Sequence, residues 1–334
     1  MKAFKAPLDA FYRATLNLDF AAGLPLLARM PQGLADRINR LRAKAALRAG
    51  LEWRSLAVGS PFVRARSLQG LAMIAGPEAA ECLVKQRFAV AAQEELDAAR
   101  IIKAPRAGFA LRFQGQSARA DGNSRGMIWL GCHVDALFVG VQALGLAGLA
   151  ELLMSSNTVE HPQVPPAVKR HFQRKYAALS LALGPNGAVL HKETHLRTMA
   201  KRLAAGAGLI VVGDIPAPNQ GRAFAVPWFG EERGLDDGVF RLAARTDALI
   251  QAFVCWREPI QPQGPTQTTA TTHCLEFGPT ADPRDPAYRE QLRELYAWHG
   301  QAIAQDPSRW WAVDLLPLAP VLRAQDSAGA STTR

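Results

Sequence analysis

The chain has 334 residues, of which 49% are hydrophobic and 20% charged, so it has ample material for a buried core and is not an intrinsically disordered protein. Its 39 Lys and Arg residues outnumber 29 Asp and Glu residues, which gives a formal net charge of +10. Such a surface suits an anionic membrane or an acidic protein partner. We expect no nucleic acid partner, because the basic residues between Arg29 and Arg48 lack interleaved aromatics and any known binding motif.

The cysteines and histidines show no metal-binding pattern. The four cysteines lie far apart, without CxxC or Cys/His spacing, which predicts reduced thiols in a cytoplasmic protein. His191 and His195 have the spacing of helical ligands but lack the glutamate of an HExxH motif and a third ligand. We therefore expect neither a disulfide nor a metal site.

The amino-terminal third of the chain has helical character. We expect no secretory signal there, because the usual charged, apolar and cleavage regions are missing, and the apolar segment from Leu16 to Leu27 is too short, and too interrupted, to span a bilayer. Residues 30–105 carry basic and apolar residues at spacings of three and four, which is typical of amphipathic helices. The expectation is a helical section, residues 1–105, packed on the main domain.

From residue 126 the pattern changes to short β-like runs separated by helices. The expected strands are residues 126–132, 177–183, 208–214, 222–226, 248–256 and 268–277, and the expected helices are residues 134–154, 192–205, 235–246 and 285–304. This alternation predicts an α/β fold with a mostly parallel central sheet flanked by helices. We expect this core to occupy residues 106–320, followed by a disordered tail at residues 321–334.

A histidine lies where the first of these strands gives way to a helix, in MIWLGCHVDALFVG (residues 127–140). Open α/β sheets place their chemistry at the carboxyl ends of strands, so His133 is a candidate catalytic residue facing an apolar groove. The alternative is that His133 only packs or caps there. Cys132 should point to the opposite face and pack in the core, because successive strand residues alternate.

Three segments resemble the bacterial lipid A lauroyl/myristoyl acyltransferases of the lysophospholipid acyltransferase superfamily. They are GCHVDALF around His133, GLIVVGD ending at Asp214 and followed by VPWFG (residues 226–230), and LAARTDALIQAFV (residues 242–254). The resemblance covers roughly residues 65–315 and implies a glycerolipid acyltransferase-like fold. It also implies that His133 is a general base on an acceptor hydroxyl, oriented by a carboxylate.

The chain departs from that family at the acid, because Phe138 occupies the position five residues after His133. Asp135 is the nearest substitute, although side chains two residues apart on a helix diverge by about 200°. Asp214 is the second candidate, since the resemblance places it at a strand end on the same sheet edge. A carboxylate within about 3 Å of a His133 ring nitrogen would distinguish a working enzyme from a degenerate homologue.

The resemblance also supplies candidates for substrate binding. Arg174 and Arg170, in VKRHFQRKY, match a basic segment that would hold an acceptor anion. The other candidates that it implies are Phe138, Phe229 and Gly230.

Two functions fit these features. The first is an acyltransferase that moves a fatty or related acyl group from an acyl carrier protein or CoA thioester to a hydroxyl or amine of a lipid or amphiphilic acceptor, with no cofactor besides the thioester. The second is a degenerate homologue that binds an acyl chain or a partner protein. The basic surface suits an acidic carrier or peripheral contact with an anionic inner membrane.

Overall fold

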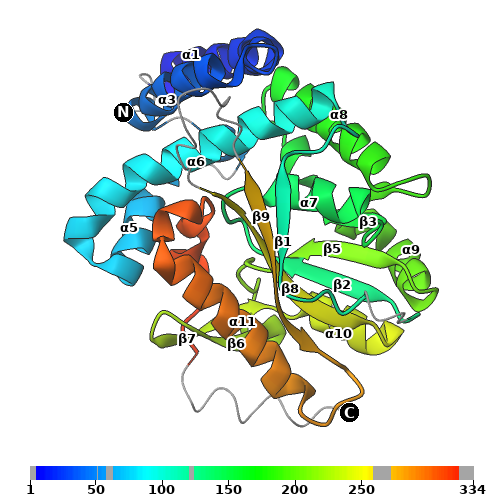
Figure 1. Cartoon of the computed structure of the whole chain (residues 1–334). Coiled ribbons are helices and arrows are strands. Elements are labelled where there is room, and N and C mark those ends of the chain that lie inside the picture. The colour runs from blue at the N-terminus through cyan, green and yellow to red at the C-terminus, as the bar shows by residue number, and fades with distance from the viewer. Residues whose placement is uncertain (1–4, 51, 58–62, 120–123, 259–271, 323–334) are drawn as a thin grey trace, which may run out of the picture.

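The structure is a computed structural model that describes residues 5–50, 52–57, 63–119, 124–258 and 272–322. Its central sheet has the strand order β1–β9–β8–β2–β5–β3–β4 (Figure 1). The strands are β1 (Leu111–Gln114), β2 (Met127–Gly131), β3 (Leu152–Ser155), β4 (Ala188–His191), β5 (Gly208–Val212), β8 (Leu249–Arg257) and β9 (His273–Ala281). All neighbours are parallel except β8 and β9. The predicted α/β fold with a mostly parallel sheet is confirmed.

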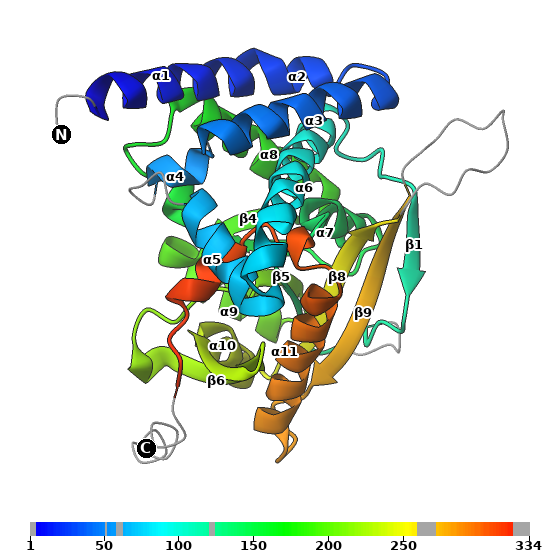
Figure 2. The ribbon, with the colours of Figure 1, turned by 90° about the vertical axis from the view of Figure 1, so that its left-hand side faces the viewer.

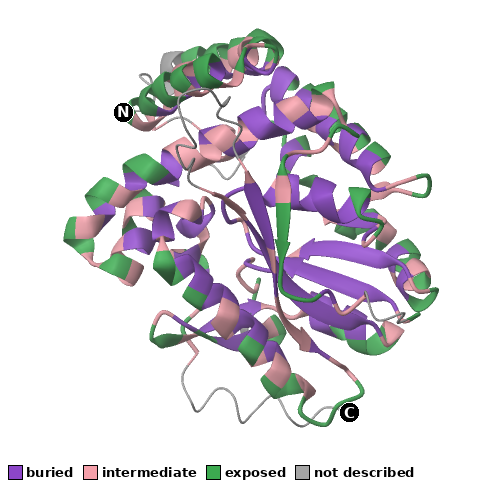
Figure 3. Ribbon diagram, viewed as in Figure 1, coloured by how far each residue is buried: buried purple, intermediate pink, exposed green. Residues whose placement is uncertain are grey.

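Helices cover both faces of this sheet. Met127 and Trp129 of β2 pack into one core, and Ile128 and Leu130, which alternate with them, pack into the other. The first core lies under α7 (Leu137–Leu146) and α8 (Pro166–Ala182), and the second under α9 (Lys192–Ala204), α10 (Gly238–Thr246) and α11 (Tyr288–Gln305). Figure 3 shows the consequence, since the central strands β2, β5 and β8 are buried, whereas the edge strand β1 and the outer sides of the helices are exposed.

A separate antiparallel hairpin, β6 (Ala223–Trp228) and β7 (Glu231–Asp236), packs beside α11. The expected strand at residues 222–226 is therefore a strand, but it lies outside the central sheet. The chain end pairs with this hairpin, because the N–H of Leu322 donates to the carbonyl oxygen of Glu232 at 2.8 Å. The tail expected from residue 321 is thus paired at its first two residues, and residues 323–334 lie outside the described residues.

The amino-terminal section is helical, as predicted. It contains α1 (Lys5–Leu18), a π-helical turn (Asp19–Gly23), α2 (Leu24–Leu27), α3 (Gln32–Ala49), α4 (Trp53–Ala57), α5 (Val63–Ala75) and α6 (Pro77–Lys103). In Figure 2, α1, α2 and α3 lie together across one end of the molecule. They share a third hydrophobic cluster with α6 and α8, which joins them to the main domain. In the described part of the chain, no helix is both long enough and apolar enough to cross a membrane.

One expected strand is a helix. Residues 177–183 form the last turns of α8 and the residue that follows it. Their buried side chains, Ala178, Leu179 and Ala182, follow the helical period. A short run of Ala and Leu does not distinguish a strand from a buried helix by hydrophobicity alone, and here the helix formers prevail.

One expected helix is two elements. Residues 134–154 contain α7 and then β3, because the chain turns at Gly148, whose φ of 70° is not compatible with a continuing helix. The strands β1 and β4 have no counterpart among the expected elements. Of the strand expected at residues 268–277, the part from His273 lies in β9, and residues 268–271 lie outside the described residues.

Candidate active site

Two adjacent strands bring His133 and Asp214 into contact. The register of β2 and β5 pairs Gly131 with Val212, and His133 and Asp214 each follow two residues later at the carboxyl edge of the sheet. Nδ1 of His133 lies 2.7 Å from Oδ1 of Asp214, and the main-chain N–H of His133 donates to Oδ2 at 3.0 Å. A carboxylate therefore lies within hydrogen-bond reach of the His133 ring, and it belongs to Asp214.

The residue immediately before Asp214 is a glycine, and a larger residue there would have to displace two buried side chains. A Cβ at Gly213 would lie 2.6 Å from Cδ1 of Leu130 and 2.8 Å from the hydroxyl oxygen of Tyr296. The main chain at this point is held from two sides, because the Gly213 N–H donates to the Gly131 oxygen at 2.8 Å and its carbonyl accepts from the Tyr296 hydroxyl at 3.0 Å. Contacts of the neighbouring main chain therefore fix the position of Asp214 independently of the contacts that its side chain makes.

The electrostatics of Asp214 favour its ionised form. The residue is only 1% exposed, and burial acts to raise the pKa of its carboxyl. The charge of His133 and hydrogen bonds from His133 and Trp310 outweigh burial and hold that pKa below its ordinary value. When His133 is neutral, the ionised Asp214 favours the tautomer with the ring proton on Nδ1, which leaves the lone pair of Nε2 free. The His133 side chain is 21% exposed, so a substrate atom can reach it.

A tryptophan pair that we did not predict completes the site. The segment around Trp310 follows the 3-10 turn η4 (Pro307–Arg309) and lies antiparallel to the residues around His133. The Trp311 N–H donates to the His133 carbonyl at 3.1 Å, and the Trp311 ring packs edge-on against the His133 ring, with centroids 4.6 Å apart. Nε1 of Trp310 donates to Oδ2 of Asp214 at 2.6 Å. The one signal in the sequence was the adjacent tryptophan pair itself.

Asp135, the other acid candidate, faces away from His133. Its carboxylate is bound by Arg257, whose main-chain N–H donates to Oδ2 at 2.8 Å and whose guanidinium pairs with Oδ1, while Arg309 lies 3.4 Å from Oδ2. The reason is local geometry, because α7 begins only at Leu137 and Asp135 sits in the preceding turn with φ at 43°. Asp135 is therefore not the acid that orients His133.

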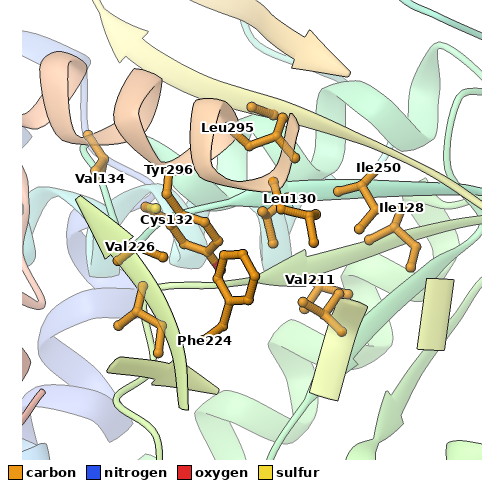
Figure 4. Packing of buried hydrophobic residues seen from close by; sticks show 14 of the residues in the cluster. Ile128, Leu130, Cys132, Val134, Val211, Phe224, Val226, Ile250, Leu295 and Tyr296 are labelled. Carbon is orange, nitrogen blue, oxygen red and sulfur yellow. The ribbon is translucent and has the colours of Figure 1, made fainter. Parts of the chain in front are cut away.

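Cys132 packs in the core, as the strand alternation predicted. It is 2% exposed and lies among Val134, Val226 and Tyr296 in the cluster of Figure 4. Burial, together with the nearby charge of Asp214, raises the pKa of its thiol well above the ordinary value. A protonated, buried thiol has no means of acting as a nucleophile beside His133.

Phe138, where the resembled family has its acid, contacts a buried lysine. The centroid of its ring lies 3.6 Å from Nζ of Lys175, and Phe172 takes the same ammonium at 3.8 Å. The Phe138 N–H, in the first turn of α7, donates to Oε1 of Glu94 at 2.7 Å. Burial lowers the pKa of Lys175 to about 7, against the opposing effect of the nearby Glu94. An aromatic cage for Lys175 thus occupies the place of the family's carboxylate.

The remaining substrate-binding candidates are divided. Arg170 and Arg174 are exposed on α8, and in the described residues no hydrogen bond or ion pair joins them to the His133–Asp214 pair. Phe229 and Gly230 form the turn of the β6–β7 hairpin, with φ values of 52° and 82°. The centroid of the Phe229 ring lies 6.0 Å from that of Trp310, so Trp310 lies between this turn and Asp214.

The expected apolar groove beside His133 does not coincide with either of two cavities in the described residues. One, of about 450 Å³, lies at the amino edge of the sheet near Arg119 and Gly206. The other, of about 380 Å³, lies at the carboxyl end of β8 between Arg257 and Arg309. His133 lines neither cavity, although its predicted place at the carboxyl end of a strand is confirmed.

Comparison with known proteins adds little about function. No protein-family model matches the chain, and no curated protein matches its sequence, so the resemblance to the lipid A acyltransferases remains a prediction. Among solved structures, one match is the 1-acyl-sn-glycerophosphate (LPA) acyltransferase PlsC from Thermotoga maritima. It is 15% identical, with a TM-score of 0.33, and the match covers 81% of this chain and 97% of that one.

Proposed function

We propose that this protein is an acyltransferase in which His133 is the general base and Asp214 the acid that orients it. The observation that carries the proposal is the 2.7 Å contact between Nδ1 of His133 and Oδ1 of a buried, ionised Asp214 at adjacent strand ends. A neutral imidazole held in one tautomer by a carboxylate, and still partly exposed, is suited to remove a proton from a hydroxyl or amine.

The reaction follows from this geometry. Nε2 of His133 takes the proton of the acceptor as its oxygen or nitrogen attacks the thioester carbonyl, and Asp214 stabilises the imidazolium that forms. Collapse of the tetrahedral intermediate breaks the carbon–sulfur bond, and the imidazolium returns its proton to the departing thiolate. The acyl thioester is the activated co-substrate, so the proposal needs no further cofactor.

The donor in this proposal is an acyl carrier protein or acyl-CoA, and the acceptor is a lipid or another amphiphilic hydroxyl or amine. The sequence resemblance to lipid A acyltransferases suggests this class, and the net charge of +10 suits an acidic carrier. The alternative of a degenerate homologue rested on the loss of the acid at Phe138. The contact between His133 and Asp214 removes the reason to prefer it.

An incubation with labelled donors tests the proposal. Purified protein is given acyl-CoA or acyl carrier protein, with long-chain alcohols, amines and lysophospholipids as acceptors, and the acylated product is followed by mass spectrometry. We expect His133→Ala to lower the transfer rate by about 100-fold to 10,000-fold, the usual contribution of a general base, while donor binding persists. Donor binding without any product, or a transfer rate that His133→Ala leaves unchanged, would overturn the proposal.

We also propose that helices α1 to α3 contact an anionic membrane. Large apolar side chains on these helices are at least half exposed, namely Phe11, Leu18, Leu26, Leu34 and Leu41. Exposed basic residues lie among them, namely Arg29, Arg37, Arg40, Lys44 and Arg48. Two acids of this region, Asp19 and Asp36, are paired with Arg42 and Arg100. Exposed apolar side chains beside exposed cations favour the headgroup region of anionic lipids.

A further inference from the structure

The two oxygens of Asp214 have different partners. Oδ2 accepts two N–H groups, from the main chain of His133 at 3.0 Å and from the indole of Trp310 at 2.6 Å. Oδ1 is left for the ring of His133 at 2.7 Å. The rotation of the carboxylate about its Cβ–Cγ bond is set by these three contacts, and the indole is the shorter of the two on Oδ2 and its one side-chain donor among the described residues.

Trp310 is itself held rigidly. It is 1% exposed, its main chain forms an antiparallel bridge with Val134, and its ring packs edge-on against Trp228 with centroids 5.4 Å apart. An indole fixed in this way brings its N–H to Oδ2 without further ordering of the side chain. The hydrogen bond to an ionised acceptor is of the stronger, charge-assisted kind.

We propose that Trp310 is the positioning residue of the His133–Asp214 pair, which holds the carboxylate so that Oδ1 faces the imidazole. This inference rests on the proposed acyl transfer, because positioning matters only if His133 is a base. The Trp310 indole orients the Asp214 carboxylate, which in turn orients His133. Trp310 itself makes no contact with the reacting atoms. Its removal changes Asp214, and through Asp214 the readiness of His133 to accept a proton.

Trp228 provides the matched control. It is also 1% exposed and lies in the same aromatic cluster, but its Nε1 donates to the main-chain oxygen of Tyr296 at 2.7 Å and not to Asp214. Trp310→Phe and Trp228→Phe therefore each remove one buried indole N–H from the same cluster. Only Trp310→Phe removes a hydrogen bond to the carboxylate.

The experiment follows the titration of Asp214 by NMR in protein labelled with ¹³C at the aspartate carboxyl carbons. The Asp214 resonance is assigned by its absence in Asp214→Asn. We expect Trp310→Phe to raise the titration midpoint by about one pKa unit, equivalent to about 1.4 kcal/mol, and to lower kcat by about tenfold with little change in the KM for the acyl donor. Trp228→Phe keeps an aromatic ring against Trp310 and leaves the hydrogen bond from the Trp310 indole to Asp214 in place, so its Asp214 midpoint should stay near that of the wild-type protein, although both variants lose stability.

The outcomes separate this inference from the proposed function. An equal Asp214 midpoint in the unchanged protein and Trp310→Phe would overturn the positioning role. A shifted midpoint in a protein that transfers no acyl group would instead overturn the acyltransferase proposal. If Trp310→Phe does not fold, replacing the Trp310 indole with benzothiophene, which keeps the ring shape and lacks the N–H, gives the same test with the same expected and contrary results.

Discussion

The variant Asp214→Asn keeps the shape of the proposed acid, removes its charge and turns one hydrogen-bond acceptor into a donor, because it replaces one oxygen of a buried carboxylate with an amide nitrogen. Two donors, the main-chain N–H of His133 and the indole N–H of Trp310, point at Oδ2. The amide oxygen of asparagine should therefore take the Oδ2 position, since an NH₂ group there would face two donors. The NH₂ group then faces Nδ1 of His133 in place of Oδ1.

This exchange forces the wrong tautomer on His133. Because the amide donates, Nδ1 must accept, and the ring proton moves to Nε2, the nitrogen that would receive the proton of the acceptor. A catalytic histidine in the wrong tautomer typically loses about 10,000-fold in turnover, or about 5.4 kcal/mol in activation free energy. We expect the turnover of Asp214→Asn at neutral pH to fall by about this factor, to the level of His133→Ala.

The assay measures the thiol released from the acyl donor in the presence of acceptor, with urea unfolding in parallel. Asp247→Asn is the control, because Asp247 precedes β8 at the opposite edge of the sheet. Its φ of 56° is a left-handed conformation that asparagine tolerates, so full turnover is expected. A folded Asp214→Asn protein whose turnover stays within tenfold of the unchanged protein would refute the reasoning.

Three further variants test the surroundings of the site. Phe138→Glu places a carboxylate beside Lys175, whose Nζ lies 3.6 Å from the Phe138 ring centroid. The new carboxylate should pair with that ammonium, so the rate of acyl transfer should not increase. A gain in turnover would contradict this pairing. Lys175→Met should raise the free energy of unfolding at pH 7, measured with urea. Burial lowers the pKa of Lys175 from 10.5 to about 7, so between these pH values the unfolded chain binds more protons than the folded protein. The wild-type protein therefore gains stability as the pH rises, and the stability advantage of Lys175→Met should shrink by about 2 kcal/mol from pH 7 to pH 9. An advantage that stays constant over this range would count against a buried ammonium at Lys175. The double variant Leu18→Glu, Leu41→Glu should no longer float with anionic vesicles at low salt. The control Leu196→Glu changes an exposed leucine on α9 and should float like the wild-type protein. Equal flotation of the two variants would exclude helices α1 to α3 as the membrane-binding surface.

The sequence was sufficient wherever the signal lay in contiguous residues. The apolar run of β2, followed by glycine and then by a helical period, predicted that His133 lies at the carboxyl end of a strand. The same reasoning located the long helix α6, whose apolar spacing of three and four is sustained over the segment, and β5, whose short apolar run is almost entirely buried. It failed at residues 177–183, where a short Ala and Leu run has no period of its own and burial against α6 and α7 favours a helix.

The choice of the acid was decided by tertiary structure alone. Asp135 is two residues from His133 and turns away from it, whereas Asp214 is 81 residues away and contacts it, because β2 and β5 are neighbours in a particular register. Trp310, a further 96 residues along the chain from Asp214, reaches the same carboxylate through the packing of the segment after α11. Hydrogen-bond partners at a sheet edge depend on which strands are adjacent and how they are aligned, and that information is not present in any one stretch of sequence.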